Sequence, residues 1–155
     1  VKLYIAGISG KTGACCFFKK ICTGKQEKPF YEVIFQIGSK DNMAVGTPEG
    51  DKAKEILNEF MQGFEERNPQ LKVFSAHLHM DEATPHLHID FIPYITGSKR
   101  GLSTRVSLKK ALEAQGFKGE GKTDNERNLW IESEKDALAQ VMQRHGIKRE
   151  HKGTP

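Results

Sequence analysis

The sequence predicts an α+β domain, because strand-type and helix-type patterns occur in the same chain. Residues 71–79 and 86–92 alternate between apolar and polar side chains, which is the period of a strand with one buried face. Residues 47–68 and 128–145 instead place apolar side chains three and four positions apart, as amphipathic helices do. The chain has 155 residues, the usual length of one domain. We therefore expect one domain of mixed strands and helices.

Composition excludes several classes of protein. Hydrophobic residues make up 37% of the chain and charged residues 28%, so it is not collagenous, mucin-like or wholly disordered. No apolar run is long enough to cross a membrane, and the first residues lack the layout of a secretion signal. Cys15, Cys16 and Cys22 are odd in number and two are adjacent, which does not fit a disulfide framework. We expect a cytoplasmic protein with no membrane partner.

Two strands are expected near the start of the chain. Residues 2–6 have a strand-like composition and precede a glycine-rich turn. Residues 31–37 are rich in aromatic and β-branched side chains, which indicates a strand buried on at least one face.

The clearest helix follows these strands. Thr47 suits the N-cap, Pro48 suits the first helical position, and acidic residues fill the first turn. Asn68 and Pro69 are expected to end the helix. Its apolar stripe consists of Ala53, Ile56, Leu57, Phe60, Met61 and Phe64.

Two further helices are expected after the alternating runs. A short one covers 108–114, with Ser107 as its cap and Gly116 as its stop. A longer one runs from about Asn128 to His145, and Gly146 ends it. The stripe of the longer helix consists of Trp130, Glu134, Ala137, Leu138, Val141 and His145.

The two alternating runs predict a pair of antiparallel strands. The six residues between them suit a connection between antiparallel neighbours, and Pro93 is expected to end the second strand. The side chains expected toward the helices are Phe74, Ala76, Leu78, Leu87, Ile89 and Phe91. Those expected on the opposite face are Val73, Ser75, His77, His79, His86, His88, Asp90 and Ile92.

Four of the six histidines of the chain lie on this second face. If His79 sits opposite His86, an antiparallel register places His77 opposite His88, with directly opposed Cβ atoms about 4.5–5.5 Å apart. Four crowded imidazoles would repel one another if protonated. A neutral cluster that holds a divalent cation resolves this, because neutral imidazole is a common metal ligand.

Acidic residues accompany the cluster. Asp81 or Glu82 could act as a ligand, orient a histidine or accept a proton, and Asp90 is a candidate for orienting a ligand. His77 is the weakest candidate for a ligand, and its other possible role is to line the site or to hydrogen-bond a phosphate. The residues alone leave the metal open among zinc, copper, iron and nickel, which suit imidazole, and manganese or magnesium, which prefer oxygen.

The string of residues 79–88, HMDEATPHLH, resembles the third motif of the Mob/Pre family of plasmid mobilisation relaxases, also called plasmid recombination enzymes. These are HUH endonucleases, named after a His-hydrophobic-His pair that matches His86-Leu87-His88 here. The flanking segments 31–38, 100–103 and 130–146 also agree with the family.

The extent of this resemblance divides the chain into three parts. Residues 1–24 form an atypical N-terminal segment, residues 25–150 form the relaxase-like core, and residues 151–155 form a flexible tail.

The resemblance implies a fold, a reaction and a partner. The fold would be a central antiparallel sheet with the two histidine strands at its centre and helices on one face. The enzyme would nick one strand of a single-stranded or hairpin origin of transfer during plasmid mobilisation and conjugation, with a Tyr or His as nucleophile.

The resemblance also assigns residues to the site. His79, His86 and His88 would hold the metal, which is manganese or magnesium by family, with zinc or nickel possible in the purified protein. Glu82 would be the acid that assists the nucleophile or orients a ligand.

Basic residues follow the histidine strands. They are candidates for contacts with DNA phosphates, which depend strongly on salt, although a solvated basic helix end is an equal alternative. These residues are Lys99, Arg100, Arg105, Lys109 and Lys110.

The first family motif, which carries the nucleophile, is not found in the chain. No histidine precedes His77, and Tyr4, Tyr31 and Tyr94 are expected to be packing residues. This predicts a relaxase core that is truncated or deficient in nicking. Three functions stay open: a metal-dependent relaxase, a non-catalytic module that binds single-stranded DNA or a partner protein, and a metal-dependent hydrolase that uses bound water with Glu82 as its base.

Overall fold

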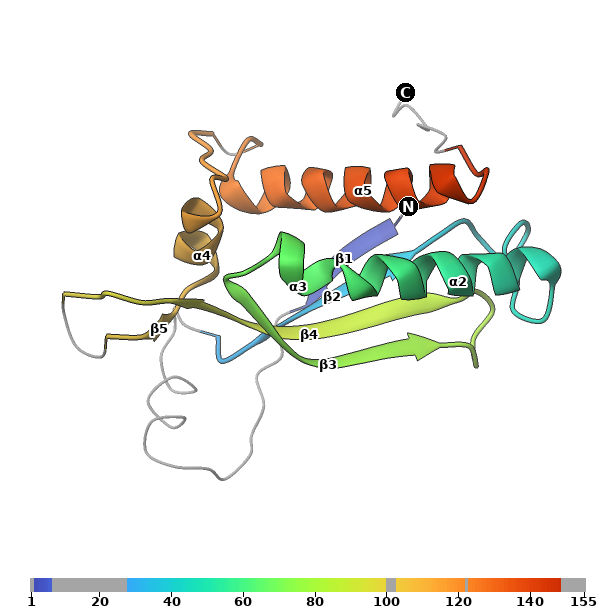
Figure 1. Cartoon of the computed structure of the whole chain (residues 1–155), viewed down its shortest axis with the longest axis horizontal. Helices are drawn as coiled ribbons and strands as arrows, with labels where there is room; N and C mark the ends of the chain where they lie inside the picture. The colour runs from blue at the N-terminus through green and yellow to red at the C-terminus, as the bar shows by residue number, and fades with distance from the viewer. Residues whose placement is uncertain (1, 7–27, 100–102, 122, 149–155) are drawn as a thin grey trace.

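The chain folds into an antiparallel sheet with helices packed against it, so the predicted α+β class is confirmed (Figure 1). The computed structural model describes residues 2–6, 28–99, 103–121 and 123–148, and of residues 2–6 it describes the backbone. The strands are β1 (Lys2–Ala6), β2 (Tyr31–Gln36), β3 (Leu71–His79), β4 (His86–Ile95) and β5 (Arg105–Val106). The helices are α2 (Pro48–Gln62), α3 (Phe64–Arg67), α4 (Leu108–Ala114) and α5 (Glu126–Arg144).

The strand order places β4 inside the sheet and β3 at its edge. Four strands follow the order β1-β2-β4-β3, and β5 pairs with the far end of β4. The expectation that both histidine strands lie at the centre is therefore wrong for β3. The reason is that β2 pairs along the other side of β4, while none of the described strands pairs with the outer edge of β3.

The first predicted helix is confirmed at its start and interrupted near its end. The Thr47 hydroxyl accepts a hydrogen bond from the Gly50 amide at 3.1 Å, and Pro48 occupies the first turn. The helix ends at Gly63, where the short helix α3 begins and runs to Arg67. Asn68 then caps α3, as its position before a proline favours.

The two later helices begin at side-chain caps. Ser107 accepts a hydrogen bond from the Lys110 amide at 3.4 Å, so α4 has the predicted bounds. Asn125 accepts from the Asn128 amide at 2.9 Å, and α5 therefore starts two residues earlier than predicted. Gly146 follows α5 with a φ of +76°, a left-handed conformation that ends helices and favours glycine.

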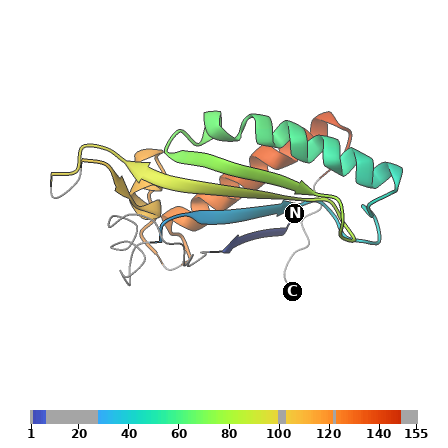
Figure 2. The same ribbon diagram turned by 90° about the horizontal axis from the view of Figure 1, so that it is seen from below.

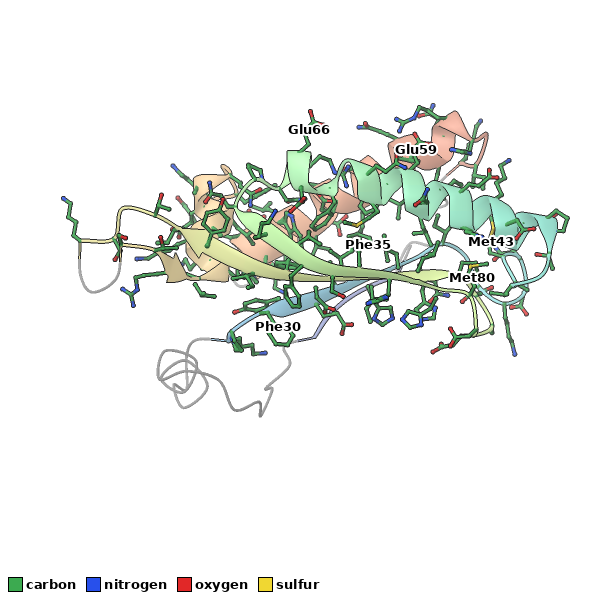
Figure 3. The ribbon with its side chains drawn as sticks, turned by 60° about the horizontal axis from the view of Figure 1, so that its bottom comes forward. Phe30, Phe35, Met43, Glu59, Glu66 and Met80 are labelled. Atoms are coloured by element: carbon green, nitrogen blue, oxygen red, sulfur yellow. The ribbon has the colours of Figure 1, made fainter. Side chains whose placement is uncertain are left out.

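One face of the sheet forms the hydrophobic core with α2 and α5. Phe35 of β2 and Phe60 of α2 meet with ring centroids 4.6 Å apart, and Phe35 lies between sheet and helix in Figure 3. Figure 2 shows both long helices on this same face. The fully buried side chains include Val33, Phe35, Ile56, Leu57, Phe60, Phe64, Ile89, Phe91, Leu112, Trp130 and Leu138. The described helices thus leave the histidine face of the sheet uncovered.

A β-bulge in β3 overturns part of the predicted alternation. The register shifts between Val73 and Ser75, so Val73 packs against the core although it was expected on the histidine face. Phe74, expected in the core, is 54% exposed and meets the ring of Phe30 edge to face. A bulge adds one residue to a strand and so reverses which residues face the core, and nothing in the residue types announces it.

The expected strand end at Pro93 is also wrong, because β4 continues to Ile95. The Tyr94 amide donates to the Gln70 carbonyl at 2.9 Å, on the β3 side. Backbone groups of successive residues point to opposite edges of a strand, so Pro93 faces the other edge, where β2 has already ended. Its missing N–H therefore removes no sheet hydrogen bond, and its carbonyl accepts from Ser107 at 3.2 Å.

A buried polar network fixes α5 to the end of α3. The Glu134 carboxylate accepts hydrogen bonds from Arg67 at 3.1 Å and from the Asn68 amide at 2.9 Å. The Trp130 indole N–H donates to the Asn68 side-chain oxygen at 2.7 Å. Glu134 was expected in the apolar stripe of the helix, and it tolerates burial there because cationic and amide donors satisfy its oxygens.

Candidate functional site

The histidines meet where β3 ends and β4 begins. His79 pairs with His86 and His77 pairs with His88, so the register predicted from the spacing is confirmed. The expected clustering of all four rings on one patch is confirmed only for three of them.

Three rings form a nearly equilateral group, the histidine triangle: His79, His86 and His88. Their centroids are 5.1 Å apart for His79–His86, 4.7 Å for His79–His88 and 5.0 Å for His86–His88. The exposed His77 ring approaches only the His79 ring, at 6.4 Å, and lies outside the triangle. This agrees with its rank as the weakest of the four candidates.

Each ring of the histidine triangle has its Nδ1 atom engaged. The Nδ1 of His88 lies 2.6 Å from Glu32 Oε1, that of His86 lies 2.9 Å from the Thr84 carbonyl, and that of His79 lies 3.3 Å from Asp81 Oδ1. These partners are acceptors, so each neutral ring carries its proton on Nδ1. The lone pair of Nε2 then remains available in all three rings, as in metal-ligating histidines.

The segment between the two strands is fixed by hydrogen bonds. The Gln36 amide donates to Thr84 Oγ1 at 2.9 Å, and the Val45 backbone N–H donates to the Ala83 carbonyl at 3.1 Å. Thr84 is buried, and its carbonyl is the one that orients His86. Met43 and Met80, labelled in Figure 3, mark this end of the sheet. The ring of His86 is therefore held in place by both β2 and the loop before α2.

His79 is the least constrained ring of the triangle. Its side chain is 40% exposed, and the Asp81 side chain that contacts it is 80% exposed. The pKa of Asp81 is held below its ordinary value first by a hydrogen bond from its own backbone N–H and then by the hydrogen bond to His79. Asp81 is therefore an ionised partner for His79 at neutral pH.

Glu82 lies at the rim of the histidine triangle. Its Oε1 is 3.9 Å from His86 Nε2, which is a charge approach and not a hydrogen bond, and its side chain is 70% exposed. Among the acidic contacts of the triangle, this is the one made to an Nε2 atom. Glu82 can thus reach a group bound beside the free nitrogens.

The donor set fits a divalent cation in chemistry and spacing, but the donors do not yet converge. An imidazole nitrogen lies about 2.1 Å from zinc, and two rings roughly 90–110° apart at one ion would have centroids about 4.5–5.2 Å apart. The triangle has these separations. Within the described ranges, however, no group of three or more His, Cys, Asp or Glu side chains is arranged to hold an ion as it stands. The exposed ring of His79 is the one free to turn.

Sequence reasoning missed the acid that orients His88. Asp90 was the candidate, but Glu32 on the neighbouring strand makes the contact, and its side chain is only 17% exposed. Asp90 Oδ1 is instead buried without a hydrogen-bond partner. Glu32 is the one charged residue of β2, which was a signal, but the neighbour of β4 was not known from the sequence.

The basic candidates lie at the opposite end of β4 from the histidine triangle. From His88 to Ile95 the strand runs about 23 Å at roughly 3.3 Å per residue, and Lys99 and Arg105 follow that end. Lys109 forms ion pairs with Glu113 at 3.8 Å and with Glu126 at 3.5 Å. Lys110 is exposed on α4, and Arg100 lies outside the described residues. The structure thus does not bring Lys99, Arg105, Lys109 or Lys110 together with the histidines.

The tyrosines occupy different environments. Tyr31 stacks on Phe91 at 6.1 Å, and burial raises the pKa of its hydroxyl. The Tyr94 hydroxyl donates to the Pro69 carbonyl at 3.1 Å. Tyr4 of β1 pairs with Ile34, which pairs with His88, so Tyr4 stands in the same cross-strand row as the site.

The fold and the site define an α+β domain that presents a cluster of three histidines on the sheet face that the described helices leave open. A protein-family model described as plasmid recombination enzyme matches residues 19–150. The chain therefore belongs to the plasmid recombination enzyme family, as its resemblance predicted. Comparisons with curated proteins and with solved structures gave no match. None of the described helices is both long and apolar enough to cross a membrane.

Proposed function

We propose that this domain binds a divalent metal ion through His79, His86 and His88 and processes the DNA of a plasmid or integrative element. The observation that carries the proposal is the histidine triangle. All three Nδ1 atoms have hydrogen-bond acceptors, and all three Nε2 lone pairs are left for a metal ion. Family membership supports the DNA substrate, and a single-stranded or hairpin origin of transfer is the proposed form.

The proposed chemistry is transfer of a DNA phosphoryl group. When bound, the cation supplies Lewis acidity at a phosphate oxygen, for which manganese or magnesium is the proposed ion. Glu32 and the Thr84 carbonyl hold the rings of His88 and His86 in the tautomer that leaves Nε2 free. Glu82 would accept a proton from the attacking group, a role that its position 3.9 Å from His86 Nε2 supports.

The charge of the site gives this proposal a testable corollary. Glu32, Asp81, Glu82 and Asp90 surround the histidines, so the site without a cation repels a phosphate. We therefore expect single-stranded DNA to bind more tightly when manganese is present. Fluorescence anisotropy of a labelled oligonucleotide, with and without manganese, measures this. Equal affinity in both conditions would mean that DNA does not approach the histidine triangle.

The deciding experiment combines metal titration with a nicking assay. Manganese binding is followed by electron paramagnetic resonance, and the chain is then incubated with manganese and a labelled origin oligonucleotide and resolved on a denaturing gel. A covalent adduct indicates a relaxase, retention without cleavage indicates a DNA-binding module, and cleavage without an adduct indicates a hydrolase with water as nucleophile. Absence of metal binding or absence of DNA binding would overturn the proposal.

If an adduct forms, the first variant is Tyr4→Phe. The reason is its row in the sheet, shared with His88 through Ile34. Tyr94→Phe is the matched control, because that hydroxyl is already committed to the Pro69 carbonyl.

A further inference from the structure

An aromatic pair, the exposed Phe74 and the half-buried Phe30, lies on the same sheet face as the histidines. Phe74 is 54% exposed, and within the described residues it is the large apolar side chain that stands out to solvent. Its ring meets that of Phe30 edge to face, with centroids 5.4 Å apart and planes at 89°. Figure 3 shows Phe30 below the sheet, on the side away from α2.

A bulge in the backbone of β3 turns the Phe74 ring outward. Without the bulge between Val73 and Ser75, the alternation that ends in Leu78 would turn Phe74 toward the core. With the bulge, Val73 fills the core and Phe74 faces outward. Bulges often redirect a side chain beside a functional site.

A second observation on this face calls for a ligand with an N–H group. Asp90 pairs with Ser75 on one side and Glu32 on the other, between Phe74 and His88 along the sheet. Its Oδ1 is buried and has no hydrogen-bond partner. A buried acceptor without a donor is costly, so a ligand gains binding energy there if its binding opens Oδ1 and brings a donor to it.

We propose that Phe74, supported by Phe30, is a stacking platform for a nucleobase of the single-stranded DNA whose backbone reaches the histidine triangle. A nucleobase has a flat π-face for the ring and N–H donors for Asp90. Four residues of β3 separate Phe74 from His79, about 15 Å along the strand, which a DNA strand covers in a few nucleotides. Lys28, exposed and two residues before Phe30, lies beyond the aromatic pair as seen from the histidines, with its Nζ 6.0 Å from the centroid of the Tyr31 ring, and offers a cation to a phosphate on that side.

This inference rests on the proposed function, and the test separates the two. Fluorescence anisotropy measures the affinity of labelled single-stranded oligonucleotides for the wild type, Phe74→Ala, Phe74→Leu and Phe74→Trp. Base stacking contributes about 1–3 kcal/mol, so Phe74→Ala should weaken binding about 5- to 150-fold. Phe74→Leu should also weaken it because it keeps apolar area without a π-face, and Phe74→Trp should restore it. The salt dependence and the manganese affinity should not change, because no phosphate contact or ligand is lost.

Oligonucleotides with one abasic position identify the contact as a base. The abasic position is moved along the oligonucleotide, one variant for each nucleotide. At one of these positions it should strongly weaken binding to the wild type but should not further weaken binding to Phe74→Ala. Asp90→Asn should reduce any preference for oligo-dC, which offers an amino group, over oligo-dT.

Four outcomes overturn the platform. They are equal affinity of Phe74→Ala and wild type, full affinity of Phe74→Leu, the same loss in both proteins for every abasic oligonucleotide, and a loss of self-association instead of DNA binding. If the wild type binds no single-stranded DNA, the proposed function itself fails. Phe74 is exposed, so its replacement does not disturb the core, and circular dichroism confirms that the variants are folded.

Discussion

At the scale of single residues, the site depends on which histidines have a fixed tautomer. His79 and His77 stand two residues apart on one strand, and only His79 belongs to the triangle. This pair supplies a matched comparison, because both side chains reach solvent and neither packs in the core.

We expect His79→Ala to lower manganese affinity at least tenfold and His77→Ala to change it little. Isothermal titration calorimetry of the two variants and the wild type measures the difference. His86→Ala should lose most of the affinity, because it removes the most buried ring of the triangle. Equal losses for His77→Ala and His79→Ala would place the site elsewhere on the face. Cys15→Ala, outside the described residues, should cost none.

Glu32 contacts the His88 ring, and its proposed role is to orient that ring and not to bind the metal ion. Its carboxylate accepts a hydrogen bond from the Nδ1–H of His88 at 2.6 Å. Removing such partners of metal-bound histidines lowers metal affinity about 10- to 100-fold. We expect this loss for Glu32→Ala and a smaller one for Glu32→Gln, whose amide oxygen can still accept. Nitrogen NMR of the His88 ring should report loss of the Nδ1-protonated tautomer in Glu32→Ala. An unchanged tautomer population would contradict the positioning role.

At the scale of elements, helix α2 supports the site from a distance. Gly50, in its first turn, touches the loop before the helix so closely that an added Cβ would lie 2.0 Å from the Ala44 carbonyl oxygen. The next residue of that loop, Val45, bonds the Ala83 carbonyl beside the histidines.

Gly50→Ala should therefore destabilise the protein, although alanine is the better helix former. Helix propensity favours alanine by about 1 kcal/mol, whereas overpacking against the rigid carbonyl costs about 1–3 kcal/mol. Urea denaturation should show a lower midpoint, and manganese affinity should fall because the loop moves. Lys52→Ala, exposed on the same helix, is the control. A more stable Gly50→Ala protein would show that the loop yields freely.

Glu59 links α2 to the end of α5 in a pH-dependent way. It accepts hydrogen bonds from His145 at 2.7 Å and from Arg144 at 2.6 Å, and these hold its pKa below the usual 4.5, with the His145 bond as the larger cause. A lowered folded pKa means that the stabilisation is complete above 4.5 and is lost as the pH falls below it.

We expect the urea midpoint of the wild type to fall more steeply below pH 4.5 than that of Glu59→Gln. Glu55→Gln, an exposed acid on the same helix, should behave like the wild type. Parallel acid dependence of Glu59→Gln and wild type would mean that other carboxylates govern acid unfolding.

The starts of α2 and α4 were predictable because capping chemistry is local, whereas the break of α2 at Gly63 and the cap of α5 at Asn125 were not predicted. Ser107 and Thr47 carry the signal in their own side chains and in the residues that follow. The continuation of β4 past Pro93 was not predictable, because it depends on which edge of the strand the proline faces. The bulge in β3 was equally hidden, since Val73, Phe74 and Ser75 suit a regular strand.

At the scale of the whole molecule, the buried network around Glu134 holds the helical layer together. Its side chain is 3% exposed and bonds Arg67 and Asn68, which in turn accepts from Trp130. Glu134→Ala takes the carboxylate away from Arg67 and leaves the buried Asn68 amide with the Phe64 carbonyl as its acceptor, and we expect a loss of about 2 kcal/mol in the free energy of unfolding. Glu132→Ala, on the exposed side of α5, should cost under about 1 kcal/mol. If denaturant titrations give similar losses of stability for Glu134→Ala and Glu132→Ala, the network does not stabilise the helical layer.

The candidate site was largely readable from the sequence, since the spacing of His79, His86 and His88 fixes their register once the strands are antiparallel. What escaped was long-range: Glu32 is 56 positions from His88, and its strand reaches β4 only through the sheet order. The same order put β3 at the edge. Pairing of distant strands is set by the core as a whole, which no local pattern describes.

The edge position of β3 has a consequence for the aggregation of this protein. An uncovered strand edge invites another chain to add a strand, which begins aggregation. Here the bulge breaks the regular spacing of that edge, the Val73 N–H is already bonded to Glu65 at 3.3 Å, and Lys72 places a charge beside it. We therefore expect the irregularity that exposes Phe74 also to hinder the pairing of this edge with the sheet of another copy.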